Sequence, residues 1–270
     1  MTSIIQAIDV HGHYGVSTDQ KCALTNRFMT GDAAEVVRRA RRARIALTLV
    51  SPLAGLMIKS HPDVERANRD TANVVARRPG LRQWVVLNPR NRRTFDQAQA
   101  LLAAPRCIGV KIHPEQHKYP IRQPGRAIFE FAERHGIVVA THSGQRRSLP
   151  EDFVKFANDF PGARLILAHL GFGYDGDIAH QVRAIQRSRH GNVYVDTSSS
   201  MSIVPNLIEW AVREIGADRI LFGSDTPLYF VSMQRARIDC AEIRAADKRL
   251  ILAGNAQRLF GKKLTEGTAC

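Results

Sequence analysis

Histidine and aspartate residues gather near the start of the chain, in the stretch IIQAIDVHGHY from Ile4 to Tyr14. Asp9, His11 and His13 are spaced two residues apart, and alternate residues of a β-strand point to the same side. The apolar residues that precede them are enough for one buried strand, so the three side chains would converge near its end. Imidazole is the commonest protein ligand for zinc-like cations, and a His-x-His pair holds two ligands on one side of an ion. The alternative, one core histidine and one solvated histidine, stays open on this stretch alone.

Polar residues of the same kinds end several later apolar runs. They occur in KIHP, THSG, AHLG and GSDTP, and the residues concerned are Lys111, His113, His142, His169 and Asp225. Taken singly, each could be an ordinary polar strand end or turn cap. The remaining histidines fall in expected loops or helices, and we interpret them as surface residues (His61, His117, His135, His180 and His190).

The elements that must position these residues are short apolar runs alternating with helical segments. After the first strand, we expect strands over residues 45–50, 81–87, 108–112, 137–140, 164–168, 193–196 and 219–222. Asp32 with Glu35 three residues later resembles a capping box that begins the first long helix, whereas residues 15–30 are expected to form a loop. Later helices are expected over residues 94–104, 126–135, 151–160 and 177–189, among others.

Short runs rich in valine, isoleucine and leucine suit a parallel sheet buried on both faces. Eight strand–helix repeats with no linker predict an α/β protein, a single (β/α)₈ TIM barrel over residues 1–262 with a C-terminal tail over 263–270. The carboxyl ends of the strands form the catalytic face of such a barrel. It is improbable that so many histidine, lysine and aspartate residues would end strands on one face by chance, so we expect a metal site there.

Composition narrows the class of protein. The 270 residues are 44% hydrophobic and contain no apolar run of 18 residues, so we expect no membrane span. No secretion signal is recognised, and four scattered cysteines favour a reducing cytoplasm. The net charge is +14, with its densest cluster in VVRRARRARIA, which we interpret as a solvated helix exterior. Such charge attracts anions, but we do not expect a nucleic acid partner.

The motifs DVHGH, THSG, AHLG, FGSDTP and GNAQRLFG resemble those of the amidohydrolase superfamily. More narrowly, the chain is similar to the branch that includes aminocarboxymuconate-semialdehyde decarboxylase, and the likeness runs from Asp9 to Gly261. The resemblance implies one divalent metal ion, expected to be Zn²⁺ with Mn²⁺ as an alternative. Its ligands would be His11, His13, His142 and Asp225, and His169 would assist the metal-bound water.

Physical chemistry suggests roles for the neighbouring residues. Asp225 would move a proton between water and leaving group, and Asp9 would orient a ligating imidazole from behind. Lys111 is expected to remain unmodified and to bind a substrate anion, although binuclear relatives carboxylate a lysine at this position. The other expected substrate contacts are His113, Arg146, Phe172 and Tyr174.

Four functions compete. The first is hydrolysis of a small anionic ester, lactone or amide by a metal-activated water. The alternative in the same family is non-oxidative decarboxylation of a carboxylated aromatic or muconate-like acid. A TatD-like metal-dependent nuclease ranks lower because IGVKIHP carries a lysine where that family has a bridging glutamate. A non-catalytic basic binding protein ranks last. The expected partner is a small anionic organic substrate, and a homodimer is one option for the oligomeric state.

Overall fold

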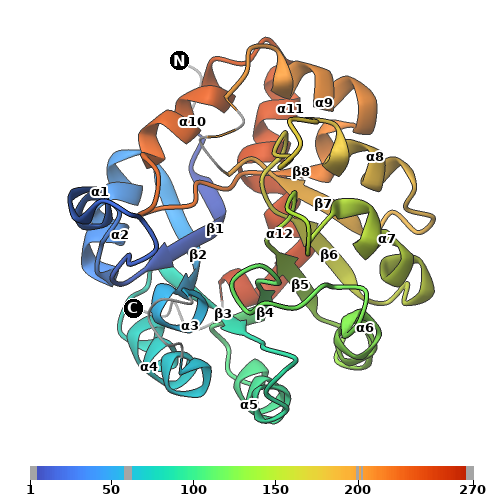
Figure 1. Ribbon diagram of the computed structural model, residues 1–270. Helices are drawn as coiled ribbons and strands as arrows, with labels where there is room; N and C mark the ends of the chain where they lie inside the picture. The colour runs from blue at the N-terminus through green and yellow to red at the C-terminus, as the bar shows by residue number, and fades with distance from the viewer. Residues whose placement is uncertain (1–4, 58–62, 199–200, 202, 266–270) are drawn as a thin grey trace.

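Eight parallel strands surround a central axis, and helices cover the outside of the sheet (Figure 1). This computed structural model describes residues 5–57, 63–198, 201 and 203–265. The strands follow the order of the chain around the sheet: Ala7–Tyr14 (β1), Ile45–Pro52 (β2), Leu81–Val86 (β3), Cys107–Ile112 (β4), Val138–Thr141 (β5), Arg164–Leu167 (β6), Val193–Asp196 (β7) and Ile220–Leu221 (β8). The architecture is the predicted TIM barrel.

Helices follow the strands along the chain. They are Ala23–Phe28 (α1), Ala33–Arg42 (α2), Leu53–Leu56 (α3), Val64–Ala76 (α4), Arg93–Leu102 (α5), Gly125–Arg134 (α6), Pro150–Asp159 (α7), His180–Gln186 (α8), Leu207–Ile215 (α9), Val231–Asp239 (α10), Ala245–Arg249 (α11) and Asn255–Phe260 (α12). Shorter helical turns cover Ala217–Arg219, Leu250–Gly254 and Gly261–Leu264.

The barrel closes between its last and first strands. The backbone N–H of Val10 donates to the carbonyl of Phe222 at 2.9 Å, and the N–H of Asp225 donates to the carbonyl of His11 at 2.7 Å. A further parallel bridge joins Gly12 to Thr226. The residues just after β8 are therefore held directly beside the chemistry-bearing end of β1.

Large side chains fill the interior of the barrel, and one glycine makes room for the largest of them. Trp84 on β3 is fully buried, and its indole N–H donates to the carbonyl of Val10 at 2.9 Å. A Cβ atom at Gly109 would lie 2.7 Å from the Trp84 ring and 2.4 Å from the carbonyl oxygen of Val138. Since real Cβ atoms do not approach that closely, β4 needs glycine at this position.

The predicted helix start at Asp32 is confirmed, because the Asp32 carboxylate accepts the N–H of Glu35. Two helix expectations differ from the structure. The segment expected to be a loop over residues 15–30 contains α1. The helix expected over 177–189 begins only at His180, because Asp177 instead accepts the N–H of Ala179 in a local turn.

The last described residues pack against the base of the barrel. The guanidinium of Arg82 donates from Nε to the carbonyl of Lys263 at 3.1 Å and from Nη2 to that of Leu264 at 2.6 Å. Leu264 is buried. The expected tail boundary at residue 263 is thus not a packing boundary, and residues 266–270 lie outside the described part of the chain. No helix of the described part is long and apolar enough to cross a membrane.

Candidate metal centre and active-site pocket

Three buried ligand groups meet at the carboxyl end of β1. Asp225 Oδ1 lies 3.0 Å from His13 Nε2 and 3.5 Å from His11 Nε2. The side chains of His11, His13 and Asp225 are all buried, and their ligand atoms lie within 4.8 Å of one another. The short β8 ends just before Asp225, and the seam with β1 brings that carboxylate to the two imidazoles.

The hydrogen bonds behind the two imidazoles set their tautomers. His11 Nδ1 faces a carboxylate oxygen of Asp196 at 2.8 Å, and His13 Nδ1 faces the carbonyl oxygen of Ser51 at 3.1 Å. Both oxygens only accept, so each Nδ1 carries the proton and, in a neutral ring, each Nε2 presents a lone pair. Both Nε2 atoms face the carboxylate of Asp225, so each can meet it as a proton donor or, once deprotonated, share a cation with it. Two imidazole nitrogens and a carboxylate oxygen at this spacing fit a divalent ion.

The residue that orients His11 is Asp196 rather than Asp9. Asp9 accepts the backbone N–H of His11 at 3.1 Å and the hydroxyl of Ser224 at 2.6 Å, so it fixes the backbone of the β1–β8 seam. The expectation that Asp9 holds a ligating ring therefore differs from the structure. Burial raises the pKa of Asp9 to about 7, although the Ser224 hydroxyl bond opposes this. Asp196 was detectable in the sequence, because it ends the expected strand VYVD.

His142 and His169 form a second part of the site. His142 Nδ1 lies 3.0 Å from His169 Nε2, and His142 Nε2 lies 2.7 Å from the amide oxygen of Gln145. His169 Nδ1 is 2.8 Å from the hydroxyl of Ser198. Within the described residues, the close ligand groups are His11–His13–Asp225 and His11–His169–Asp196. His142 belongs to neither group, so its role as a metal ligand stays a prediction.

Lys111 reaches the metal-ligand cluster from the end of β4. Its Nζ lies 2.9 Å from His11 Nε2, and the side chain is buried. Burial lowers the pKa of Lys111 to about 8, against the opposing charges of Asp196 and Asp225. His113, two residues further on, stacks on His142 with ring centroids 4.3 Å apart. Burial also lowers the pKa of His113 well below its usual value, so this ring is neutral.

The carboxylate of Asp225 is held ionised. Burial by itself would raise its pKa, but the charge of His11 and the hydrogen bond with His13 outweigh burial and hold the pKa well below the usual value. Burial lowers the pKa of His13, and it lowers that of His169 to about 4. An ionised carboxylate beside a His13 ring whose pKa is lowered suits metal binding, because metal ligands must be deprotonated.

These groups line a cavity of about 240 Å³ at the mouth of the barrel. Of the expected site residues, those that line it are His11, His13, Lys111, His113, His142, His169, Phe172 and Asp225. Arg146 and Tyr174 are not among the lining residues. Instead, the Arg146 guanidinium lies over the Tyr174 ring, 5.1 Å from its centre. Further lining residues that the sequence did not indicate include Met29, Gln116, Gln145, Met201, Leu228 and Tyr229.

Comparisons with known proteins assign the chain to an enzyme family. Residues 8–262 match the amidohydrolase family, and the chain therefore belongs to this family of enzymes. Among curated proteins, it is 33% identical over 116 residues to the gamma-resorcylate decarboxylase of a Polaromonas species. That match covers 37% of this chain and 35% of the relative's length, so only about a third of the relative is spanned.

Solved structures share the fold over nearly the whole chain. A dihydroxybenzoic acid decarboxylase from Polaromonas, crystallised with manganese and 2-nitroresorcinol, has a TM-score of 0.76 at 16% identity, covering 99% of this chain and 100% of that one. A 5-carboxyvanillate decarboxylase from Sphingomonas paucimobilis has a TM-score of 0.71 at 14% identity, with coverages of 95% and 99%. The predicted superfamily is confirmed. The comparisons favour the decarboxylase alternative over the hydrolase that the sequence analysis ranked first.

Proposed function

We propose that this protein is a metal-dependent, non-oxidative decarboxylase of a carboxylated aromatic acid. The observation that carries the proposal is the buried Lys111 ammonium beside His11 and Asp225 at the base of a small cavity. A cation at this depth favours an anionic substrate, and the rings of His142 and Phe172 offer surfaces for a planar ring. The decarboxylase relatives support the same substrate class.

The ion is proposed to be Zn²⁺ or Mn²⁺, held by His11, His13 and Asp225, with His142 as a further ligand. When bound, such an ion acts as a Lewis acid that anchors and polarises substrate oxygens. The fit depends on the fixed tautomers of His11 and His13 and on a buried, ionised carboxylate.

The side chains supply binding and proton transfer. Lys111 pairs with an anionic oxygen of the substrate, and the His169 ring, held through Nδ1 by Ser198, borders the same cavity and helps to orient the substrate. When the carboxyl group leaves as CO₂, its bonding electrons stay on the ring carbon, which then needs a proton. We assign that transfer to Asp225, because its carboxylate lines the cavity and can carry a proton from a substrate hydroxyl to the ring carbon. The substrate oxygen that gives up this proton becomes the anion that Lys111 pairs with, and solvent reprotonates it when the product leaves.

The test is an assay of the metal-loaded protein with 2,6-dihydroxybenzoate, 5-carboxyvanillate and a panel of lactones and esters. We expect one CO₂ per acid consumed and, in D₂O, one deuterium at the ring position that carried the carboxyl group. Hydrolysis of a lactone or ester without any CO₂ release from the acids would contradict the proposal and restore the hydrolase interpretation.

A further inference from the structure

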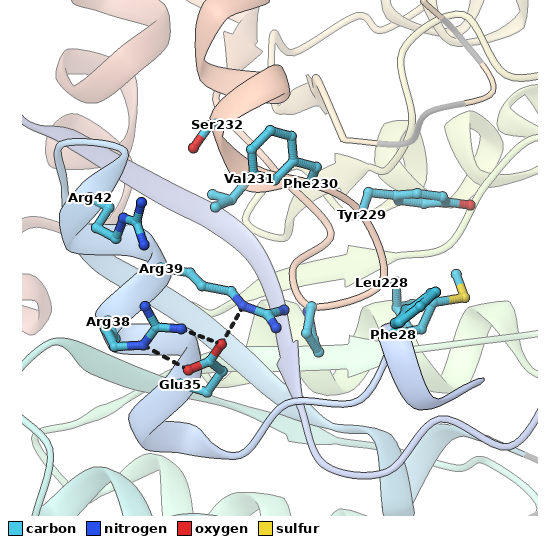
Figure 2. Close-up of a pocket in the computed structure, with 12 residues that line it drawn as sticks. Phe28, Glu35, Arg38, Arg39, Arg42, Leu228, Tyr229, Phe230, Val231 and Ser232 are labelled. Atoms are coloured by element: carbon cyan, nitrogen blue, oxygen red, sulfur yellow. Dashed lines mark hydrogen bonds and ion pairs between the residues drawn. The ribbon is translucent and has the colours of Figure 1, made fainter. Parts of the chain in front are cut away.

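A second cavity lies beside the active-site pocket, between α2 and the loop that leads from β8 to α10. It has a volume of about 510 Å³ (Figure 2). Three residues, Met29, Leu228 and Tyr229, line both this cavity and the active-site pocket. The two cavities are therefore neighbours that share one wall.

One wall of this second cavity is a cationic face of α2. Glu35, Arg38, Arg39 and Arg42 are spaced i, i+3, i+4 and i+7, which places them on one side of the helix. The arginine cluster of this helix was expected to be a solvated helix exterior, and Arg38 and Arg42 are indeed exposed. Together with Arg39 they also line the cavity. Core packing of α2 uses other positions, namely Ala33, Val36 and Ala40.

Positive charge is in excess on this wall. The Glu35 carboxylate accepts from Arg38 through Nε and Nη2 and from Arg39 through Nε. One carboxylate thus serves two guanidinium groups. Arg42 has no hydrogen bond or ion pair with any residue of the described chain. Arg42 and the terminal nitrogens of Arg39 remain as donors suited to a carboxylate.

The opposite wall is aromatic. Figure 2 shows Phe28, Tyr229 and Phe230 across the cavity from the arginines. Phe28 is 67% exposed and Phe230 is 70% exposed, although both are large apolar side chains that line the cavity. A flat apolar ring would cover them, while its negative group would meet the guanidinium groups.

We propose that this cavity is a second binding site, specific for an aromatic carboxylate. Three guanidinium groups that have one carboxylate among them and face exposed rings select a ligand that is both planar and anionic. The inference goes beyond the proposed function and does not depend on it, since binding here requires neither metal nor turnover.

The test is calorimetric titration of the full-length protein with benzoate, and with the uncharged benzamide as a comparison. We expect Arg39→Met/Arg42→Met to weaken one benzoate-binding event at least tenfold, and benzamide to bind there weakly in every protein. Arg41→Met is the matched control, because Arg41 is an exposed residue of the same helix that does not line the cavity. Its benzoate affinity should equal that of the unmodified protein.

A second variant guards against a folding defect in the double arginine change. Phe230→Ser alters an exposed side chain and should also weaken the same event. Benzoate titrations that are identical for Arg39→Met/Arg42→Met and Arg41→Met would overturn the proposal. Dimerisation that Phe230→Ser abolishes, with benzoate affinity unchanged, would overturn it as well, because a second copy would then be the occupant. Loss of decarboxylation with benzoate binding intact would contradict only the proposed function.

Discussion

Asp196 fixes the imidazole of His11 more directly than any other residue. Its carboxylate accepts the Nδ1 proton at 2.8 Å, which directs the Nε2 lone pair toward Asp225. We expect Asp196→Asn to weaken metal affinity by about 10- to 100-fold, because an amide can present an N–H to His11 and favour the wrong tautomer. Competition with a chromogenic chelator measures the change. Asp96→Asn, on the exposed face of α5, is the control, and equal affinities in the two variants would contradict this role for Asp196.

Lys111 provides the cation that we assign to substrate binding. Lys111→Met keeps most of the length and the apolar stem but removes the ammonium. We expect KM for the aromatic acid to rise by about tenfold or more, since a charge-assisted hydrogen bond contributes about 1.5–3 kcal/mol. Steady-state kinetics with the metal-saturated variant provide the measurement. An unchanged KM together with a weakened metal affinity would show that Lys111 belongs to the metal site instead.

The loop after β6 shows how an element positions a site residue. It carries Phe172, whose ring centre lies 6.1 Å from those of His142 and His169. His180, at the start of α8, ties this loop to α7: its Nδ1 lies 3.0 Å from Glu151, and its Nε2 lies 3.0 Å from Asp175. His180 was expected to be a surface residue, and His117 as well, but both are buried. Sequence spacing gave no sign of these partners.

This arrangement predicts a pH-dependent stability. Burial opposes protonation of His180, but the carboxylates of Glu151 and Asp175 outweigh burial and raise its pKa above 6.5. A histidine whose pKa is higher in the folded than in the unfolded state stabilises the fold in full at pH values below the unfolded-state pKa. That stabilisation is lost as the pH rises through the folded-state pKa. We therefore expect the melting temperature to fall as the pH rises from about 6.5 through the raised pKa of His180, and to fall less in His180→Gln. His190→Gln, at an exposed position, should behave like the unmodified protein, and identical pH profiles for all three would contradict the prediction.

Local patterns predicted the elements and the face that carries the chemistry. The strand ends were readable because each apolar run stops at a polar residue, as at His13, Lys111 and His169. The partners of those residues were not readable, because barrel closure determines them. Asp196 meets His11 across 185 positions of sequence, and Arg39 faces Tyr229 only because α2 lies beside the loop after β8. The periodicity of apolar residues along the chain carries no information about such long-range contacts.

At the scale of the whole molecule, Arg82 links the base of the barrel to the C-terminal segment. Its buried guanidinium donates to the carbonyls of Pro79, Leu81, Lys263 and Leu264. Arg82→Met would leave these carbonyls without their charged donor. We expect the free energy of unfolding to fall by about 3 kcal/mol or more, because each bond to a charged group contributes about 1.5–3 kcal/mol. Arg78→Met, an exposed change nearby, should alter it by less than about 0.5 kcal/mol.

Deletion of residues 263–270 separates anchoring from simple loss of charge. If Arg82 stabilises the protein by holding Lys263 and Leu264, the deletion should itself lower the free energy of unfolding. Arg82→Met should then lower the free energy of unfolding by less in the shortened chain than in the full one. Urea denaturation of the four proteins of this cycle measures the coupling. A deletion without effect on the unfolding free energy would show that the segment does not anchor Arg82 and that Arg82 acts through its other partners, which include the carbonyls of Pro79 and Leu81.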